Sequence, residues 1–264
     1  MKRVVVFLAT VGSLMASNIV ISTGSPSGVY SSVGKKIASQ IGGAKVISSK
    51  GSIENIENIL SGKAQAAIVQ KDALRYYTSK HPAVETKIEY IGDIYKECAF
   101  LVVRKDGKVS SDADLQSKGV KVGVGQKGSG TAVTWAYLTQ LEPNFKKATP
   151  VPVGGIRALA KVASGALDAM LFTSKPQFTK PLFKTVNSNP SLEFAPIKDW
   201  DLNDKFEGKP VYKFEEVQVR DSFFGNSVDT ICTTASVITT SKLPEGEFDL
   251  LSDIVLNYKN FIIQ

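Results

Sequence analysis

The chain has 264 residues, 43% of them hydrophobic and 22% charged, and a formal net charge of +7 at pH 7. This is the composition of a globular protein with room for one large or two ordinary domains. Nucleic-acid-binding proteins usually gather their basic residues on one face or helix, and the lysines and arginines here form no such block. The charge pattern therefore argues against a nucleic-acid partner, and it is consistent with a small acidic ligand or with a solvated basic surface.

The amino terminus has the pattern of a secretory signal peptide. Met1, Lys2 and Arg3 form a basic cap, residues 4–15 are nearly all apolar or small, and Ala16 stands just before a possible cleavage point. The segment is too short for a permanent transmembrane helix, and no later run is apolar for long enough to be one. We expect residues 1–17 to be a signal peptide that directs the chain to the periplasm. A first buried strand is the alternative.

Short apolar runs alternate with helical patterns from residue 18 onward, which is typical of a parallel sheet built from βαβ units. The order occurs twice, because an offset of 103 residues sets Gly51 on Gly154 and Ala66 on Ala169. The same offset places residues 19–23 on residues 122–126 without a gap. We therefore expect two α/β lobes of one design, residues 18–103 with 232–264 and residues 104–231.

The two lobes need connections, and two β-prone segments are long enough to provide them, residues 97–105 and 229–241. Residues 247–263 show apolar residues at helical spacing, so this segment should form a helix that packs back on the first lobe. Residues 190–228 mix proline, aspartate and lysine with short β-prone runs, and their order stays open.

Polar residues and glycines follow the strands in both lobes. In parallel sheets a ligand binds beyond the carboxyl ends of the strands, so both sets of loops can face one cleft. Hydroxyls, amides and bare backbone there suit a small polar anion, and aromatic residues would form walls. The candidate ligand-binding residues are Thr23, Gly24, Ser25, Tyr30, Ser52, Asn55, Gln70, Gly128, Ser129, Gly130, Thr131, Trp135, Phe172 and Thr173.

Each candidate also has a purely structural explanation. Ser52 and Thr131 can be helix caps, Tyr30 and Trp135 can lie in the core, and the glycines can serve tight turns. Their shared position at strand ends is the reason to group them as one site.

The glycine-rich turn that opens the second lobe resembles a nucleotide loop. Gly123, Gly125 and Gly128 match G-x-G-x-x-G between a strand and a helix. A dinucleotide site also needs an acidic residue after the next strand, and that strand ends in Val153-Gly154-Gly155. The turn has no Gly-Lys-Ser or Gly-Lys-Thr ending, which excludes a P-loop. We therefore expect no cofactor, and a helix N-terminus that receives an anion.

Other catalytic signals are weak. His81 is the one histidine, it precedes a proline in an expected loop, and no serine or cysteine nucleophile elbow accompanies it. Cys98 and Cys232 stand too far apart in sequence to indicate a metal site. Export would permit a disulfide between them. However, each lies near the beginning of an expected crossing strand, and antiparallel strands would place those beginnings at opposite ends, so we expect no bond.

Several segments in the same order resemble the TAXI-type solute receptors of TRAP transporters. They are ISTGSPSGVYSSVGKKIA, SKGSIENIENILSGKAQAAIVQKD, VVRKDGKVSSDADLQSKGVKVGVGQKGSGTAVTW and ASGALDAML. The resemblance runs from about residue 21 to residue 171 and returns weakly in residues 229–241. It implies a periplasmic binding protein of the type II fold that delivers a small carboxylate, such as glutamate or 2-oxoglutarate, to an ion-coupled membrane transporter.

By position, the family's ligand loops fall on Thr23, Gly24, Ser25, Tyr30, Ser52, Asn55, Gln70 and residues 128–131. The resemblance ends after Leu171, and residues 175–216 follow no pattern of the family, so the outer wall of the second lobe is not predicted. No arginine clamp can be assigned, although Arg157 at a helix start is a possible substitute.

We therefore expect a monomeric, non-catalytic binding protein. The rival is an enzyme on the same fold, such as a small-molecule lyase, because fold does not decide function. An enzyme needs an acid or base in the cleft, and the predicted loops contain no Asp, Glu, His or Cys. A protein with an empty cleft that serves only as an interaction partner is the third possibility.

Overall fold

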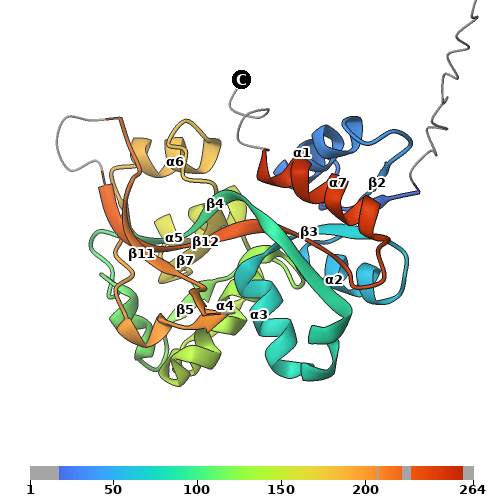
Figure 1. Ribbon diagram of the computed structural model, residues 1–264. Coiled ribbons are helices and arrows are strands. Elements are labelled where there is room, and N and C mark those ends of the chain that lie inside the picture. Colours follow the sequence, from blue (N-terminus) through green and yellow to red (C-terminus); the bar gives the residue numbers. More distant parts are fainter. Residues whose placement is uncertain (1–17, 207, 222–226, 258–264) are drawn as a thin grey trace, which may run out of the picture.

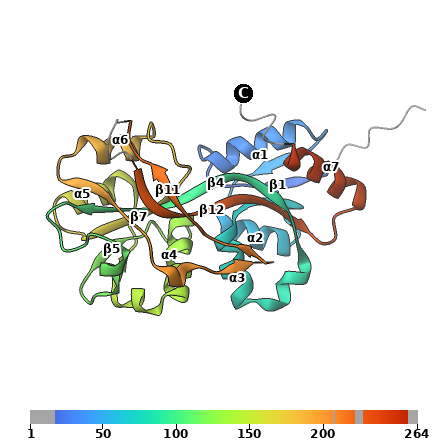
Figure 2. The same cartoon turned by 60° about the vertical axis from the view of Figure 1, so that its left-hand side comes forward.

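Two long antiparallel strands, β4 (Ile88–Arg104) and β12 (Ser227–Thr240), run side by side from one lobe to the other (Figure 1, Figure 2). The computed structural model describes residues 18–206, 208–221 and 227–257, so the predicted signal peptide lies outside the described residues. Along the pairing of the two strands the register shifts twice, between Ala235 and Ser236 and between Val237 and Ile238. Such bulges bend and twist a strand, which helps this pair to serve both lobes.

The first lobe is a parallel βαβαβ unit. Strand β1 (Val20–Ser22) lies between β2 (Lys45–Ile47) and β3 (Ala66–Gln70). Helix α1 (Val29–Ser39) packs on one face, and helices α2 (Ser52–Leu60) and α3 (Lys71–Lys80) pack on the other. Every residue of β3 is buried because the strand has neighbours on both edges and helices on both faces, which explains its continuous apolar sequence.

The second lobe repeats this design. Strand β5 (Lys121–Gly123) lies between β6 (Thr149–Val151) and β7 (Ala169–Ser174), again in parallel. Helix α4 (Gly130–Leu141) covers one face, and helices α5 (Gly155–Ala163) and α6 (Pro181–Ser188) cover the other. The fold is thus the two-lobed α/β fold that the sequence predicts.

The internal repeat needs a correction at its beginning. The offset of 103 holds for α2 and α5 and for Ala66 and Ala169 on the central strands. Ile21 pairs with Ala66 whereas Val122 pairs with Ala169, so the first strands correspond at an offset of 101. The segment between the first strand and the second helix is two residues longer in the second lobe than in the first, and the gap-free alignment of residues 19–23 with 122–126 is therefore wrong.

The remaining elements close the two lobes. Helix α7 (Glu245–Leu256) packs Leu251 and Val255 on the first lobe beside α1, as predicted, and residues 258–263 of the expected helix lie outside the described part. Strand β8 (Leu192–Ala195) pairs with β4, and β11 (Lys213–Gln218) pairs with β12. A short hairpin joins β9 (Lys205–Phe206) to β10 (Lys209–Pro210). The 3-10 helices are Pro82–Lys87, Asp112–Gln116, Pro143–Lys147 and Trp200–Leu202.

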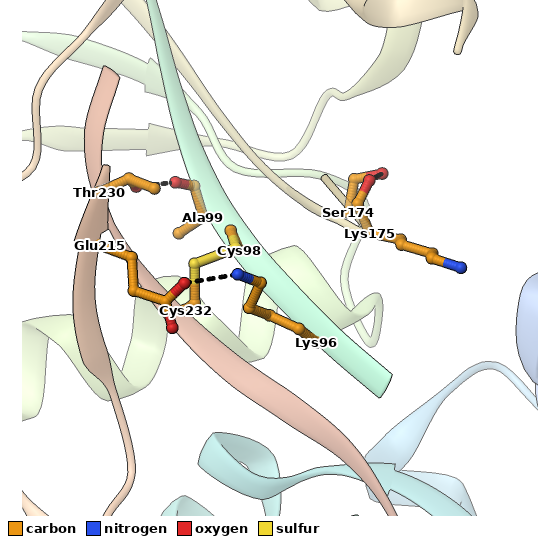
Figure 3. The surroundings of a disulfide bond; sticks show 8 residues. All are labelled: Lys96, Cys98, Ala99, Ser174, Lys175, Glu215, Thr230 and Cys232. Atoms are coloured by element: carbon orange, nitrogen blue, oxygen red, sulfur yellow. Dashed lines mark hydrogen bonds and ion pairs between the residues drawn. A yellow bond between two sulfur atoms is a disulfide. The ribbon is translucent and has the colours of Figure 1, made fainter. Parts of the chain in front are cut away.

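The expectation that the two cysteines stay unbonded is wrong. Cys98 and Cys232 are direct partners in the β4–β12 ladder and form a disulfide, with their Cα atoms 3.9 Å apart (Figure 3). The predicted crossing strand begins at Glu97, whereas β4 begins at Ile88, so Cys98 lies inside the strand and not at its beginning. The Lys96–Glu215 ion pair lies beside the disulfide. Among the helices within the described residues, none is both long and apolar enough to cross a membrane.

Candidate ligand-binding cleft

A cavity of about 370 Å³ lies between the lobes, where strand ends from both lobes converge. The first lobe contributes the loops after β1 and β2 and the end of β3, and the second lobe contributes the start of α4 and the end of β7. The cavity is lined by Gly24, Ser25, Gly28, Val29, Tyr30, Lys50, Gly51, Ser52, Gln70, Glu97, Ser129, Gly130, Thr131, Thr173, Ser174, Lys175 and Lys180.

Nine of the predicted residues meet around this cavity: Gly24, Ser25, Tyr30, Ser52, Gln70, Ser129, Gly130, Thr131 and Thr173. Gly128 lines a separate groove together with residues of α2. The structure therefore brings together segments that are up to about 150 residues apart in the chain.

Thr23 and Asn55 do not line the cavity, contrary to the sequence prediction. Thr23 is fully buried, and its hydroxyl donates to the Ile47 carbonyl at 3.1 Å. The Asn55 side chain accepts from the Ser22 hydroxyl at 2.7 Å and donates to the Ile68 carbonyl at 2.6 Å. Both side chains therefore tie the strands and α2 of the first lobe together, which is a structural role.

The two predicted aromatic walls of the second lobe are core residues. Trp135 is buried and stacks on Phe145 with ring centroids 6.1 Å apart. Phe172 packs in an aromatic cluster with Phe100 and Phe183. The cavity thus has less apolar wall than the sequence predicted. Arg157 is exposed on α5 and does not line the cavity either.

The start of α4 borders the cavity. Ser129 is its N-cap, and its hydroxyl accepts from the Ala132 N–H at 3.3 Å. The first N–H groups of an α-helix have no partner within the helix, and the helix dipole makes this end electropositive. Thr131 is not a cap, because its hydroxyl oxygen accepts from the Thr173 N–H at 3.1 Å and so ties α4 to β7.

Hydrogen bonds connect the polar residues of the first lobe into a chain. The Ser52 hydroxyl oxygen accepts from the Gln70 N–H at 3.0 Å, and the hydroxyl is hydrogen-bonded to Tyr30. The Tyr30 hydroxyl donates in turn to Glu97 at 3.1 Å. Ser52 is therefore not an N-cap of α2, where the cap residue is Gly51 and no side chain caps the helix.

Glu97 lines the cavity, although it is not among the residues that the sequence predicts. It lies on β4, and its place at the cavity corrects the expectation that the cleft holds no acidic group. Burial raises the pKa of Glu97 from 4.5 to about 7, and hydrogen bonds from Tyr30 and Tyr95 act in the opposite direction. One signal could have pointed to it, since Glu97 is an acidic residue directly before an apolar β-prone run.

Three lysines add positive charge to the same cavity: Lys50, Lys175 and Lys180. Lys180 is half-buried, and burial lowers its pKa from the ordinary value. Its Nζ donates to the Ser174 hydroxyl at 3.1 Å. Lys175 and Lys180 come from the segment that follows no family pattern, so that segment supplies part of the wall of the second lobe.

The lobes touch each other beside the cavity. A Cβ atom at Gly51 would lie 3.1 Å from the carbonyl oxygen of Gly128, so the loops approach as bare backbone. Deeper in the interface, Asp72 of α3 accepts from the hydroxyls of Thr134 at 2.7 Å and Tyr212 at 2.8 Å. The side chain of Gln70 donates to Thr134 at 3.3 Å. A cavity residue is thus linked to the buried contact between the lobes.

Among the described residues, Glu142, Asp199 and Asp201 are close enough together to share a metal ion, and they lie outside the cavity. Two of the three remain partly or fully open to solvent, where acidic groups commonly stand without an ion. Among the described residues that line the cavity, Glu97 is the one carboxylate.

Solved structures share this architecture at low sequence identity. A substrate-binding protein of an amino acid ABC transporter, AbpA from Streptococcus pneumoniae bound to L-arginine, matches with a TM-score of 0.53 and 17% identity, over 93% of this chain and 90% of that chain. The GluR0 ligand-binding core from Nostoc punctiforme in complex with L-glutamate matches with a TM-score of 0.53 and 16% identity, over 92% of this chain and 93% of that chain. XAC2383 from Xanthomonas citri bound to ATP matches with a TM-score of 0.58 and 10% identity, over 91% of this chain and 83% of that chain.

These structures carry three different ligands, so they support the type II periplasmic binding protein fold and leave the ligand to be argued from the cavity. A family model extends over nearly the whole chain. Residues 21–260 match the model of the NMT1-like family. The chain therefore belongs to the NMT1-like family.

Proposed function

We propose that this chain is a solute-binding protein that holds a small carboxylate in the cavity between its lobes. The observation that carries the proposal is the convergence of both lobes on the cavity of about 370 Å³, which contains three lysines and the N-terminus of α4 against one carboxylate. Such a set of cationic and N–H groups favours an anionic ligand. The volume lies within the range of small-molecule sites.

The second part of the proposal concerns delivery. The resemblance to TAXI-type receptors favours export to the periplasm and transfer of the ligand to a TRAP-type ion-coupled transporter. Two of the structural matches are described as binding proteins of amino acid ABC transporters, so an ABC-type membrane partner is the competing assignment. Co-purification of the chain with the membrane subunits of each transporter class would separate the two.

A ligand screen tests the binding function. We expect purified protein to show a rise in melting temperature with at least one member of a panel of dicarboxylates, amino acids and keto acids, because a ligand that binds the folded state stabilises it by mass action. Titration calorimetry should then give a single site per chain. A panel without any thermal shift would favour the alternative of an interaction protein with an empty cleft.

Glu97 also bears on the enzyme alternative, such as a lyase, because a carboxyl group with a pKa of about 7 is suited to acid–base catalysis. Binding and turnover are separated by incubating the protein with each ligand that it binds and following the ligand by nuclear magnetic resonance. We expect every ligand to be recovered unchanged. A new product that is lost in the Glu97→Gln variant would establish an enzyme instead.

A further inference from the structure

Glu97 is a carboxylate without a cationic partner in direct contact. Its two oxygens accept from the hydroxyls of Tyr30 at 3.1 Å and Tyr95 at 3.5 Å. In the described part of the chain, no ion pair within 4.0 Å includes Glu97. Glu97 is half-buried, and removing a carboxylate from water is costly unless a proton or a cation neutralises it. The cavity therefore has room for a positive group that the protein does not supply.

The cations of the cavity are placed to bind other groups. The positive charge of Lys180 lowers the pKa of Glu97, but the Lys180 side chain is hydrogen-bonded to Ser174. Lys50 and Lys175 are exposed at the cavity rim and free to meet carboxylates. The three lysines and the α4 N-terminus together provide more positive charge than the single carboxylate, Glu97, can balance. A ligand that satisfies the whole cavity therefore carries more than one negative group and one positive group.

We propose that Glu97 binds the α-ammonium group of the ligand, and that the ligand is an acidic α-amino acid. In this arrangement the carboxylates lie at the α4 N-terminus and the lysines, and the hydroxyl of Tyr30 fixes the orientation of Glu97. The inference rests on the proposed binding function and narrows it: a keto or hydroxy acid of the same carbon skeleton leaves Glu97 without its cation.

This assignment makes binding proton-linked. The groups that face Glu97 are Tyr30 from α1, Tyr95 on its own strand, Lys180 ahead of α6 and Asp72 on α3, whose negative charge raises the pKa of Glu97. With a pKa of about 7, Glu97 is protonated in a sizeable share of empty molecules at pH 7. An ammonium group at contact distance lowers the pKa, so binding of an amino acid releases about half a proton at this pH. A dicarboxylate without an ammonium group raises the pKa and takes up protons instead.

The test compares matched ligands in the intact protein. The probes are L-glutamate with 2-oxoglutarate and L-aspartate with malate, titrated by calorimetry at pH 6, 7 and 8 in buffers of different ionisation enthalpy. The variants are Glu97→Gln and, as a control, Glu193→Gln on β8, a carboxylate outside the cavity. Circular dichroism and a denaturation curve show whether each variant is folded.

We expect the wild-type protein to bind an amino acid at least tenfold more tightly than its keto or hydroxy partner, with affinity that rises with pH and with proton release. The affinity of Glu97→Gln should fall at least tenfold for the amino acid and stay unchanged for the matching keto or hydroxy acid. The affinities of Glu193→Gln should equal those of the wild type. Equal losses for both ligands, a preference for the keto acid, or proton uptake with the amino acid would overturn the inference and leave the binding function intact. The proton measurement needs no variant, so it decides the question even if Glu97→Gln does not fold. Failure to bind any carboxylate would instead remove the proposed function itself.

Discussion

Cys98 on β4 and Cys232 on β12 are direct cross-strand partners, and their disulfide joins the two strands that connect the lobes. The bond links residues 134 positions apart in the sequence, so it closes a loop of about half of the chain. Because β4 and β12 are the strands that both lobes share, this bond holds the connection between the lobes and not one lobe alone.

Removal of this bond should lower stability. The Cys98→Ala/Cys232→Ala variant is expected to lose about 2–5 kcal/mol of unfolding free energy, because a cross-link over a long loop restricts the unfolded chain. Chemical denaturation with and without a reducing agent measures the loss. The wild type should weaken under reduction to near the level of the variant, and the variant should not respond. Two free thiols in the oxidised, denatured wild type would contradict the pairing.

Gly51→Ala should impair closure of the lobes. Gly51 has φ +138°, which is unfavourable for residues with a side chain, and a Cβ atom would press on the carbonyl oxygen of Gly128 in the other lobe. We expect at least a tenfold loss of affinity for the ligand found in the screen. Gly62→Ala is the matched control, since Gly62 also has a positive φ, +76°, but has open space around it. The control should lose some stability and keep its affinity; similar affinities for both variants would show that the loop contact does not matter.

Thr131→Val tests whether the hydroxyl of Thr131 is needed for ligand affinity, because valine keeps the shape of the side chain and lacks the hydroxyl. The hydroxyl lines the cavity and also accepts from the Thr173 N–H. Loss of this acceptor leaves a partly buried N–H unpaired, which costs about 1–3 kcal/mol, and removes a donor for the ligand. We expect affinity to fall at least tenfold while Thr131→Ser stays near the wild type. Ser52→Ala should behave in the same way, because it leaves the Gln70 N–H without its acceptor. Unchanged affinity in Thr131→Val and Ser52→Ala would move the site elsewhere.

Asp72→Ala should destabilise the contact between the lobes. Asp72 is fully buried and accepts from hydroxyls of Thr134 and Tyr212, both in the second lobe. The substitution leaves two buried donors unpaired, at a cost of about 1–3 kcal/mol each. Small-angle X-ray scattering should report a larger radius of gyration than for the wild type. The exposed Asp253 on α7 provides the control, and Asp253→Ala should change neither quantity. An unchanged melting curve for Asp72→Ala would refute this role.

Glu97 should make the stability of the empty protein depend on pH. Its folded pKa is about 7 against an ordinary value of 4.5, so between these pH values the folded state binds more protons than the unfolded state. The contribution of Glu97 to the free energy of unfolding is therefore fully present below pH 4.5. It falls as the pH rises toward 7 and levels off above pH 7. The difference in unfolding free energy between the wild type and Glu97→Gln should decline across this range. A difference that stays constant from pH 4.5 to pH 8 would mean that Glu97 has an ordinary pKa.

Local patterns in the sequence determined the two repeated α/β lobes and most of the loops that meet at the cavity. Apolar periodicity and turn residues act over a few neighbouring positions, and a parallel sheet then brings the strand ends to one edge whatever the details of packing. For this reason Gly24, Ser52, Gln70 and Thr131 could be grouped from the sequence before any contact was known.

Only the tertiary structure decided which side chains enter the cavity and which are buried. The pairing of Cys98 with Cys232 depends on where β4 begins and on its register with β12, which no local pattern specifies. The same register turns Glu97 toward the cavity, while helix packing places Trp135 in the core. A shift of one residue along a strand reverses the face of every side chain, so these outcomes required the assembled sheet.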